Sequence, residues 1–158
     1  MELKEMMAAF AAEIGLGRLE PDADGVFHLG VDEMSIALAE DRNTRQLVTF
    51  AEVGEPPSGC RDRLYRVLME AMFMGRATNG AMFAVPEGGE TICLQRFDAL
   101  ATLDYDGFKA MLEAFVNDLE RWRKFVAEFQ DVADAIDADK EQEAAALHEF
   151  GLGGGIRV

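Results

Sequence analysis

Residues 64–74 read Leu-Tyr-Arg-Val-Leu-Met-Glu-Ala-Met-Phe-Met, and Gly75 ends this run. Leu, Met, Ala, Glu and Arg favour a helix, and no Pro or Gly interrupts the run. Apolar side chains occupy nearly every side of this helix, and a helix that is apolar all round is buried on both sides. Because a chain of 158 residues can hardly bury such a helix by itself, the run predicts contact with a second copy of the chain. The residues predicted at this dimer interface form one stripe: Leu64, Val67, Leu68, Ala71 and Met72.

The composition is that of one folded, strongly acidic domain. Hydrophobic residues make up 49% of the chain, which is enough for a core. The formal net charge of −15 repels phosphate groups and anionic lipids, which argues against nucleic acid and membrane surfaces as partners. No apolar run approaches the ~20 residues that span a bilayer, so we expect no membrane insertion.

Cysteine usage and the first residues indicate the compartment. Cys60 and Cys93 could pair, but two thiols in a domain of this size are typical of a reducing cytoplasm. The opening Met-Glu-Leu-Lys-Glu-Met-Met has neither a basic segment nor a long apolar one, so we expect no signal peptide. The prediction is a cytoplasmic protein.

Hydrophobic spacing and turn residues divide the chain into helices and strands. Helices are predicted over residues 2–14, from near Cys60 to Met74, and from 104–106 to 129. Strands are predicted over residues 26–31, 34–40, 46–53, 81–85 and 91–97, the last two as a hairpin. Because short turns join successive strands, we predict an α+β fold: helix, three strands, helix, two strands, helix, with a twisted antiparallel sheet flanked by helices.

The composition changes after Gln130. Residues 131–149 are acidic, rich in Ala and poorer in large apolar residues, and residues 151–155 are mostly Gly. We therefore divide the chain into an α+β domain, residues 1–130, and a partly helical extension, residues 131–158, with a flexible tail.

The predicted hairpin of residues 34–40 and 46–53 has one unusual face. If Ile36 and Leu38 lie beside Phe50 and Val48, the opposite face carries small, uncharged side chains. A sheet face that is exposed to solvent should instead be polar. That opposite face would carry Ser35, Ala37, Ala39, Leu47, Thr49 and Ala51. Either an internal helix or a partner covers it, and the internal helix is the favoured alternative. An uncovered edge strand could also pair with another chain.

Catalytic and metal-binding patterns are missing from the sequence. His28 sits in a predicted strand and His148 in the acidic extension, without an evident partner for base catalysis. Cys60 begins a helix, where a thiolate is favoured, but no His is predicted near it. Residues 20–25 resemble half a calcium loop, yet Val31 stands where its bidentate Glu would be. We therefore predict no enzyme, no metal site and no cofactor.

Several local patterns together resemble one family. Gly15-Leu16-Gly17 ends the first helix, and residues 25–29 lead into Met34-Ser35-Ile36-Ala37-Leu38. Leu68-Met69-Glu70-Ala71-Met72 is similar to a Leu-Leu-x-Ala-Asn pattern, with Met72 in place of Asn. Residues 80–85, residues 92–94 and Trp122 complete the likeness. From residue 3 to residue 129 the chain resembles the class I type III secretion chaperones of the CesT/Tir chaperone family.

The resemblance implies a homodimer built on the central helix and its neighbouring strand. It implies that the N-terminal, non-globular segment of a secreted effector wraps around this dimer, lies in grooves of the first helix and the sheet, and adds a strand to a sheet edge. It implies no nucleotide site, because release depends on the ATPase of the bacterial secretion machine. The residues expected to contact the effector are Phe10, Val26, Leu29, Ala37, Ala39 and Leu47.

Two other functions stay open on the sequence. A small-molecule-binding regulatory domain would curl the sheet around an internal cavity. A small enzyme would use Cys60 as its nucleophile.

Overall fold

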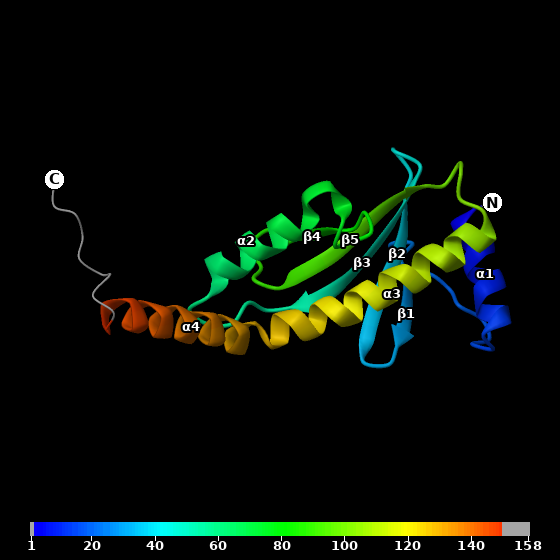
Figure 1. Ribbon diagram of the computed structural model, residues 1–158. Coiled ribbons are helices and arrows are strands. Elements are labelled where there is room, and N and C mark those ends of the chain that lie inside the picture. The colour runs from blue at the N-terminus through cyan, green and yellow to red at the C-terminus, as the bar shows by residue number, and fades with distance from the viewer. Residues whose placement is uncertain (1, 150–158) are drawn as a thin grey trace.

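The computed structural model describes residues 2–149, with side chains up to residue 142, so the predicted glycine tail lies outside the described residues. The elements follow the order helix, three strands, helix, two strands and two helices (Figure 1). The helices are α1 (Leu3–Glu13), α2 (Arg61–Met72), α3 (Tyr105–Ala127) and α4 (Phe129–Glu149), and a short 3-10 turn, η1 (Phe73–Gly75), follows α2. The strands are β1 (Phe27–Val31), β2 (Met34–Asp41), β3 (Gln46–Gly54), β4 (Met82–Ala84) and β5 (Ile92–Ala99).

The strands form one five-stranded antiparallel sheet in the order β1-β2-β3-β5-β4. Strands β1, β2 and β3 make successive hairpins, and β5 pairs with both β3 and β4. The predicted α+β class, the element order and the hairpin of the last two strands are therefore confirmed.

The predicted register of the β2–β3 hairpin is wrong by one residue. Ala37 pairs with Phe50 and Ala39 with Val48, whereas Ile36 and Leu38 pair with Ala51 and Thr49. A shift of one residue moves every side chain to the other face. Leu47, Thr49 and Ala51 therefore share the face of Ile36 and Leu38, called here the inner face, and all of them are buried.

The inner face is covered by α3, which crosses the sheet (Figure 1). Phe108, Phe115 and Leu119 of α3 are fully buried there, and Met111 accepts a 4.0 Å contact from the Thr49 hydroxyl. Helix α1 closes one end, where Phe10 meets Phe108 edge to face with ring centroids 6.0 Å apart. The small, uncharged face predicted for this hairpin is therefore divided: the internal helix covers Leu47, Thr49 and Ala51, whereas Ser35, Ala37 and Ala39 lie on the other side of the sheet. The side chains of α1 and α3 fill the space in which a curled sheet would hold a small molecule.

The other side of the sheet, called here the open face, has a row of apolar residues that are partly exposed except for Ala37, which is 6% exposed. Paired residues of neighbouring strands share a face, so the row continues from β2 into β3 and β5. The open face includes Ala37, Ala39, Val48, Phe50 and Phe97. Phe50 and Phe97 are 40% and 41% exposed, which is unusual for Phe in a sheet.

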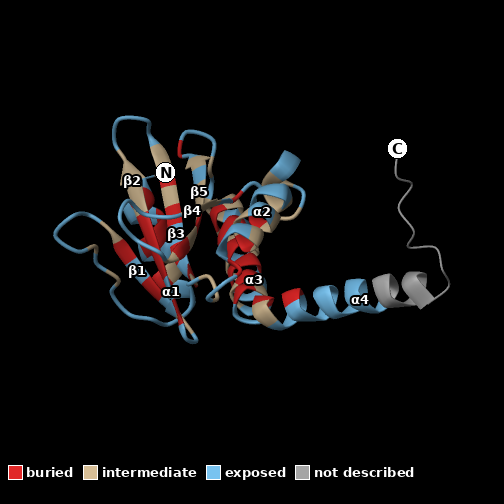
Figure 2. Cartoon of the chain, turned by 90° about the vertical axis from the view of Figure 1, so that its left-hand side faces the viewer, coloured by how far each residue is buried: buried red, intermediate tan, exposed pale blue. Residues whose placement is uncertain are grey.

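Helix α4 leaves the body of the protein as an arm (Figures 1 and 2). Its first turns are anchored, because Phe129 and Ala133 are buried and Asp137 binds Arg63 of α2 at 3.1 Å. From residue 134 to residue 142 every described side chain is exposed. Helix α4 continues through Glu149. The domain boundary at residue 130 stays a prediction.

The start of α3 can be tested by removing its N-cap. Asp104 accepts a 2.8 Å hydrogen bond from the amide of Gly107. Asp104→Ala leaves this amide without its partner, so we expect the free energy of unfolding to fall by about 1 kcal/mol in a denaturant titration. Glu120→Ala, on the exposed side of the same helix, should change it by less than about 0.5 kcal/mol. Equal losses in the two variants would contradict the capping role.

Candidate binding surfaces

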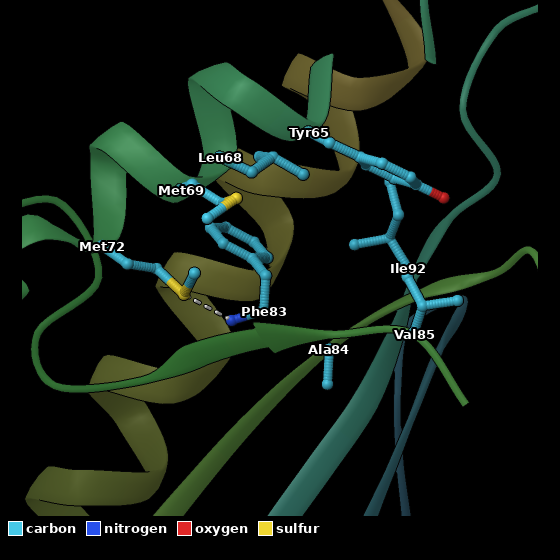
Figure 3. A pocket seen from close by; sticks show the side chains of 8 residues that line it. All are labelled: Tyr65, Leu68, Met69, Met72, Phe83, Ala84, Val85 and Ile92. Atoms are coloured by element: carbon cyan, nitrogen blue, oxygen red, sulfur yellow. Dashed lines mark hydrogen bonds between the residues drawn. The ribbon is translucent and has the colours of Figure 1, made fainter. Parts of the chain in front are cut away.

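The first candidate surface is a groove between α2 and β4 (Figure 3). It encloses about 180 Å³ and its lining is almost wholly apolar. We call it the α2–β4 groove, and it is lined by Tyr65, Leu68, Met69, Met72, Phe83, Ala84, Val85 and Ile92. Helix α2 forms because its apolar residues recur at helical spacing, and it ends where η1 turns the chain toward β4.

Met72 fixes the end of α2 to the edge strand. Its sulfur lies 3.0 Å from the backbone nitrogen of Phe83, which donates to it (Figure 3). A thioether sulfur is a weak hydrogen-bond acceptor. Here it accepts from a backbone N–H of an edge strand, a group that would otherwise be available to another chain. The residue that departs from the family pattern thus has a structural role here.

Beside this groove, α2 presents large apolar side chains to solvent. Met69, Phe73 and Met74 are 67%, 73% and 72% exposed. Tyr65 and Met69 of α2 and Phe73 of η1 form an outer patch, rimmed by Asp62 and the Arg66–Glu70 ion pair, and Met74 follows in η1. Contiguous exposed apolar residues with a polar rim are typical of a protein interaction site.

The structure separates the predicted dimer residues into two groups. Leu64 and Leu68 are 0% and 2% exposed, so they pack against the core of their own chain. Val67, Ala71 and Met72 are partly buried. The outward side of the helix is instead formed by Tyr65, Met69 and Phe73, which the sequence stripe omitted. Their spacing of four residues was the signal that could have identified them.

A second groove lies between α1, β1 and α3. Phe10, Leu29, Val31, Leu112 and Val116 line it together with polar residues of α3. Two of the predicted effector contacts, Phe10 and Leu29, therefore meet here. We call this the α1–α3 groove.

A polar contact holds the two helices of the α1–α3 groove together. The Tyr105 hydroxyl donates a 2.6 Å hydrogen bond to Glu13, which lowers the pKa of that carboxyl, and Lys109 lies 3.4 Å from it. A carboxylate that stays ionised keeps this contact at neutral pH.

The remaining predicted contacts lie elsewhere. Ala37 and Ala39 are on the open face, and Val26 precedes β1 as a partly buried residue. Leu47 is fully buried under α3. Phe50 and Phe97, the largest residues of the open face, were not predicted as contacts because the assumed register turned Phe50 to the other side.

The described residues place no reactive constellation at these surfaces. The Cys60 thiol is buried and contacts Gln130 at 3.3 Å and the Pro57 carbonyl at 3.7 Å. Burial raises the pKa of the Cys93 thiol, which disfavours its reactive form. Within residues 2–142 no group of three or more His, Cys, Asp or Glu side chains is placed to hold a metal ion. Among the described helices, none is long and apolar enough to cross a bilayer.

Comparison with solved structures finds the same fold in chains of several protein complexes. A chain of the ExsC–ExsE complex matches with a TM-score of 0.68 at 22% identity, covering 80% of this chain and 97% of that chain. The HopA1–SchA chaperone–effector complex matches with a TM-score of 0.65 at 15% identity, covering 77% and 92%. The ExoU–SpcU complex from the type III secretion system of Pseudomonas aeruginosa matches with a TM-score of 0.61 at 16% identity, covering 76% and 97%.

Sequence comparison supplies the family. A Chlamydia pneumoniae protein, CPj0713/CpB0740, is 31% identical over 122 residues, which cover 76% of this chain and 92% of that protein. The model of the Tir chaperone protein (CesT) family matches residues 5–123. The chain therefore belongs to the Tir chaperone protein (CesT) family, and with that family it is an effector-binding chaperone of type III secretion rather than an enzyme.

Proposed function

We propose that this chain acts in the bacterial cytoplasm as a homodimer. Each dimer binds the N-terminal, non-globular segment of one or more secreted effectors and keeps it soluble and competent for secretion. The observation that carries the proposal is the set of exposed apolar surfaces: the α2–β4 groove with its outer patch, the α1–α3 groove and the open face. A segment without a folded core exposes apolar side chains, and such surfaces can cover them.

The dimer is proposed to form through α2 and β4. In a two-fold interface the same surface serves both copies, so it has to be complementary to itself. Here a projecting outer patch lies directly beside an apolar groove, and Met69 belongs to both. Each copy can therefore place its outer patch against the groove of the other. In this arrangement Met72 lines the contact, whereas Leu64 and Leu68 support it from below.

Charge on the outer patch should separate the two chains without unfolding them. Met69→Asp places a carboxylate on an exposed side chain, so we expect the dimer dissociation constant to rise at least tenfold, or about 1.4 kcal/mol, in sedimentation equilibrium. Circular dichroism should show an intact fold. Ile14→Asp, at an exposed apolar residue of another surface, is the control and should leave the dimer unchanged. A tight Met69→Asp dimer would contradict the proposed interface.

The effector is proposed to contact the open face and the α1–α3 groove. The exposed rings of Phe50 and Phe97 lie on neighbouring strands, and on β2 beside them the small side chains of Ala37 and Ala39 leave room for large side chains of a client. Phe10, Leu29 and Val26 lie near the other end of the sheet and provide a second apolar contact. The acidic surface keeps the complex soluble and disfavours acidic partners. We further propose that release depends on the ATPase of the secretion machine.

The client can be identified by capture and then used to test the open face. Affinity capture from the native host with mass spectrometry should recover a secreted protein, held through its N-terminal segment at two chaperone chains per client. The double variant Phe50→Ser with Phe97→Ser should bind that segment about tenfold more weakly, because two apolar anchors are lost.

A matched control is available on α4. Val132 and Ile136 are 39% and 42% exposed, fractions similar to those of Phe50 and Phe97, and they belong to α4, which extends away from the sheet (Figure 2). Changing both to Ser should leave affinity for the client unchanged. If the α4 variant loses affinity and the sheet variant does not, the open face is not the client surface.

A further inference from the structure

The connection between α2 and β4, residues 73–81, contains several residues in the left-handed region of the backbone, and one of them is a Met. Four of its residues have positive φ: Met74 (61°), Gly75 (65°), Asn79 (48°) and Gly80 (85°). The left-handed region is open to Gly and tolerated by Asn, but it is unfavourable for Met. Gly75, Asn79 and Gly80 therefore suit the loop, and Met74 is the strained residue among these four, so contacts from elsewhere in the fold help to hold the loop.

Those contacts come from α3 and β5 and converge on Asn79. The Asn79 side-chain amide donates a 2.8 Å hydrogen bond to one oxygen of Asp118. Arg96 of β5 donates a 3.0 Å hydrogen bond to the Asn79 carbonyl. Asn79 is thus held through both its side chain and its backbone.

Each group that holds Asn79 is itself fixed by a second partner. Arg121 donates to the other oxygen of Asp118 at 2.8 Å and also to the carbonyl of Ala77 in the same loop. Arg96 is paired with Asp98 of its own strand at 2.8 Å. Asp118 is a buried carboxylate, 6% exposed, so both of its oxygens need these partners. Asp118 is the buried centre of this network, whereas Asn79 and Arg121 lie at the surface. Because a buried carboxylate needs its partners, the network favours one arrangement of the loop over α3.

We propose that Asp118, Asn79, Arg96 and Arg121 form a polar clamp that positions the α2–β4 loop for dimerisation. The loop begins with Phe73 of the outer patch and ends at β4, which forms one wall of the α2–β4 groove. The clamp therefore fixes both halves of the self-complementary surface relative to each other. This inference rests on the homodimer proposed above, and its residues act as positioning residues without touching the partner.

The test is a charge exchange within the clamp. Asn79→Asp keeps the size of the side chain and its tolerance of positive φ, but it sets one carboxylate against another. The dimer dissociation constant should rise about tenfold in sedimentation equilibrium. Adding Asp118→Asn to this variant restores a donor–acceptor pair and the original net charge, and should recover most of the lost affinity. Asn43→Asp, which adds the same charge in the exposed turn after β2, should have no effect.

Stability is measured in a background that cannot dimerise. In the Met69→Asp monomer, Asn79→Asp sets a carboxylate against the buried Asp118, so we expect the thermal midpoint to fall by roughly 2–8 °C while circular dichroism shows the fold retained. If Asn79→Asp dimerises as the wild type does, or if Asp118→Asn gives no rescue, the clamp is not a positioning device. A larger loss of stability in the monomer would assign it to folding instead. If the wild type is monomeric, or if Met69→Asp leaves its dimer intact, the proposed interface itself fails.

Discussion

Leu64 and Leu68 attach α2 to the core of its own chain, and this attachment determines what the protein can offer to others. Once that side of the helix is buried, the opposite side must face outward with Tyr65, Met69 and Phe73. In this position α2 also forms one wall of the α2–β4 groove. One side of this apolar helix therefore packs into the core of its own chain, and the opposite side forms an interaction surface.

An aromatic series connects this surface to the rest of the molecule. Phe83 of β4 meets Trp122 of α3 at a centroid distance of 5.0 Å, Trp122 meets Phe125 at 5.3 Å, and Phe125 meets Phe129 of α4 at 5.5 Å. Large rings in edge-to-face or tilted contact are stiff and bury much apolar area. The edge strand, the long helix and the base of the arm are therefore packed as one unit, although they are distant in the sequence.

The sequence predicted the elements well because their signals are local. Asp104 at a helix start, the alternation of residues 34–40 and the turn at residues 86–89 each act over a few residues. The strand register was mispredicted because both faces of residues 46–53 are largely apolar, with Leu47 and Ala51 on one and Val48 and Phe50 on the other. Only the packing of α3 selects between them. Periodicity showed that α2 is apolar on both sides, but it cannot say which apolar side meets the chain's own core.

The α4 arm has a consequence for the shape of the particle. A helix from Phe129 to Glu149 is roughly 30 Å long at 1.5 Å per residue, and most of it stands clear of the body (Figure 2). Such a projection raises the frictional coefficient of the protein in solution without adding to its mass. The chain will therefore migrate through a sizing column ahead of a compact protein of 17.4 kDa. Elution volume overstates the mass of this molecule, and scattering or sedimentation equilibrium gives its true value.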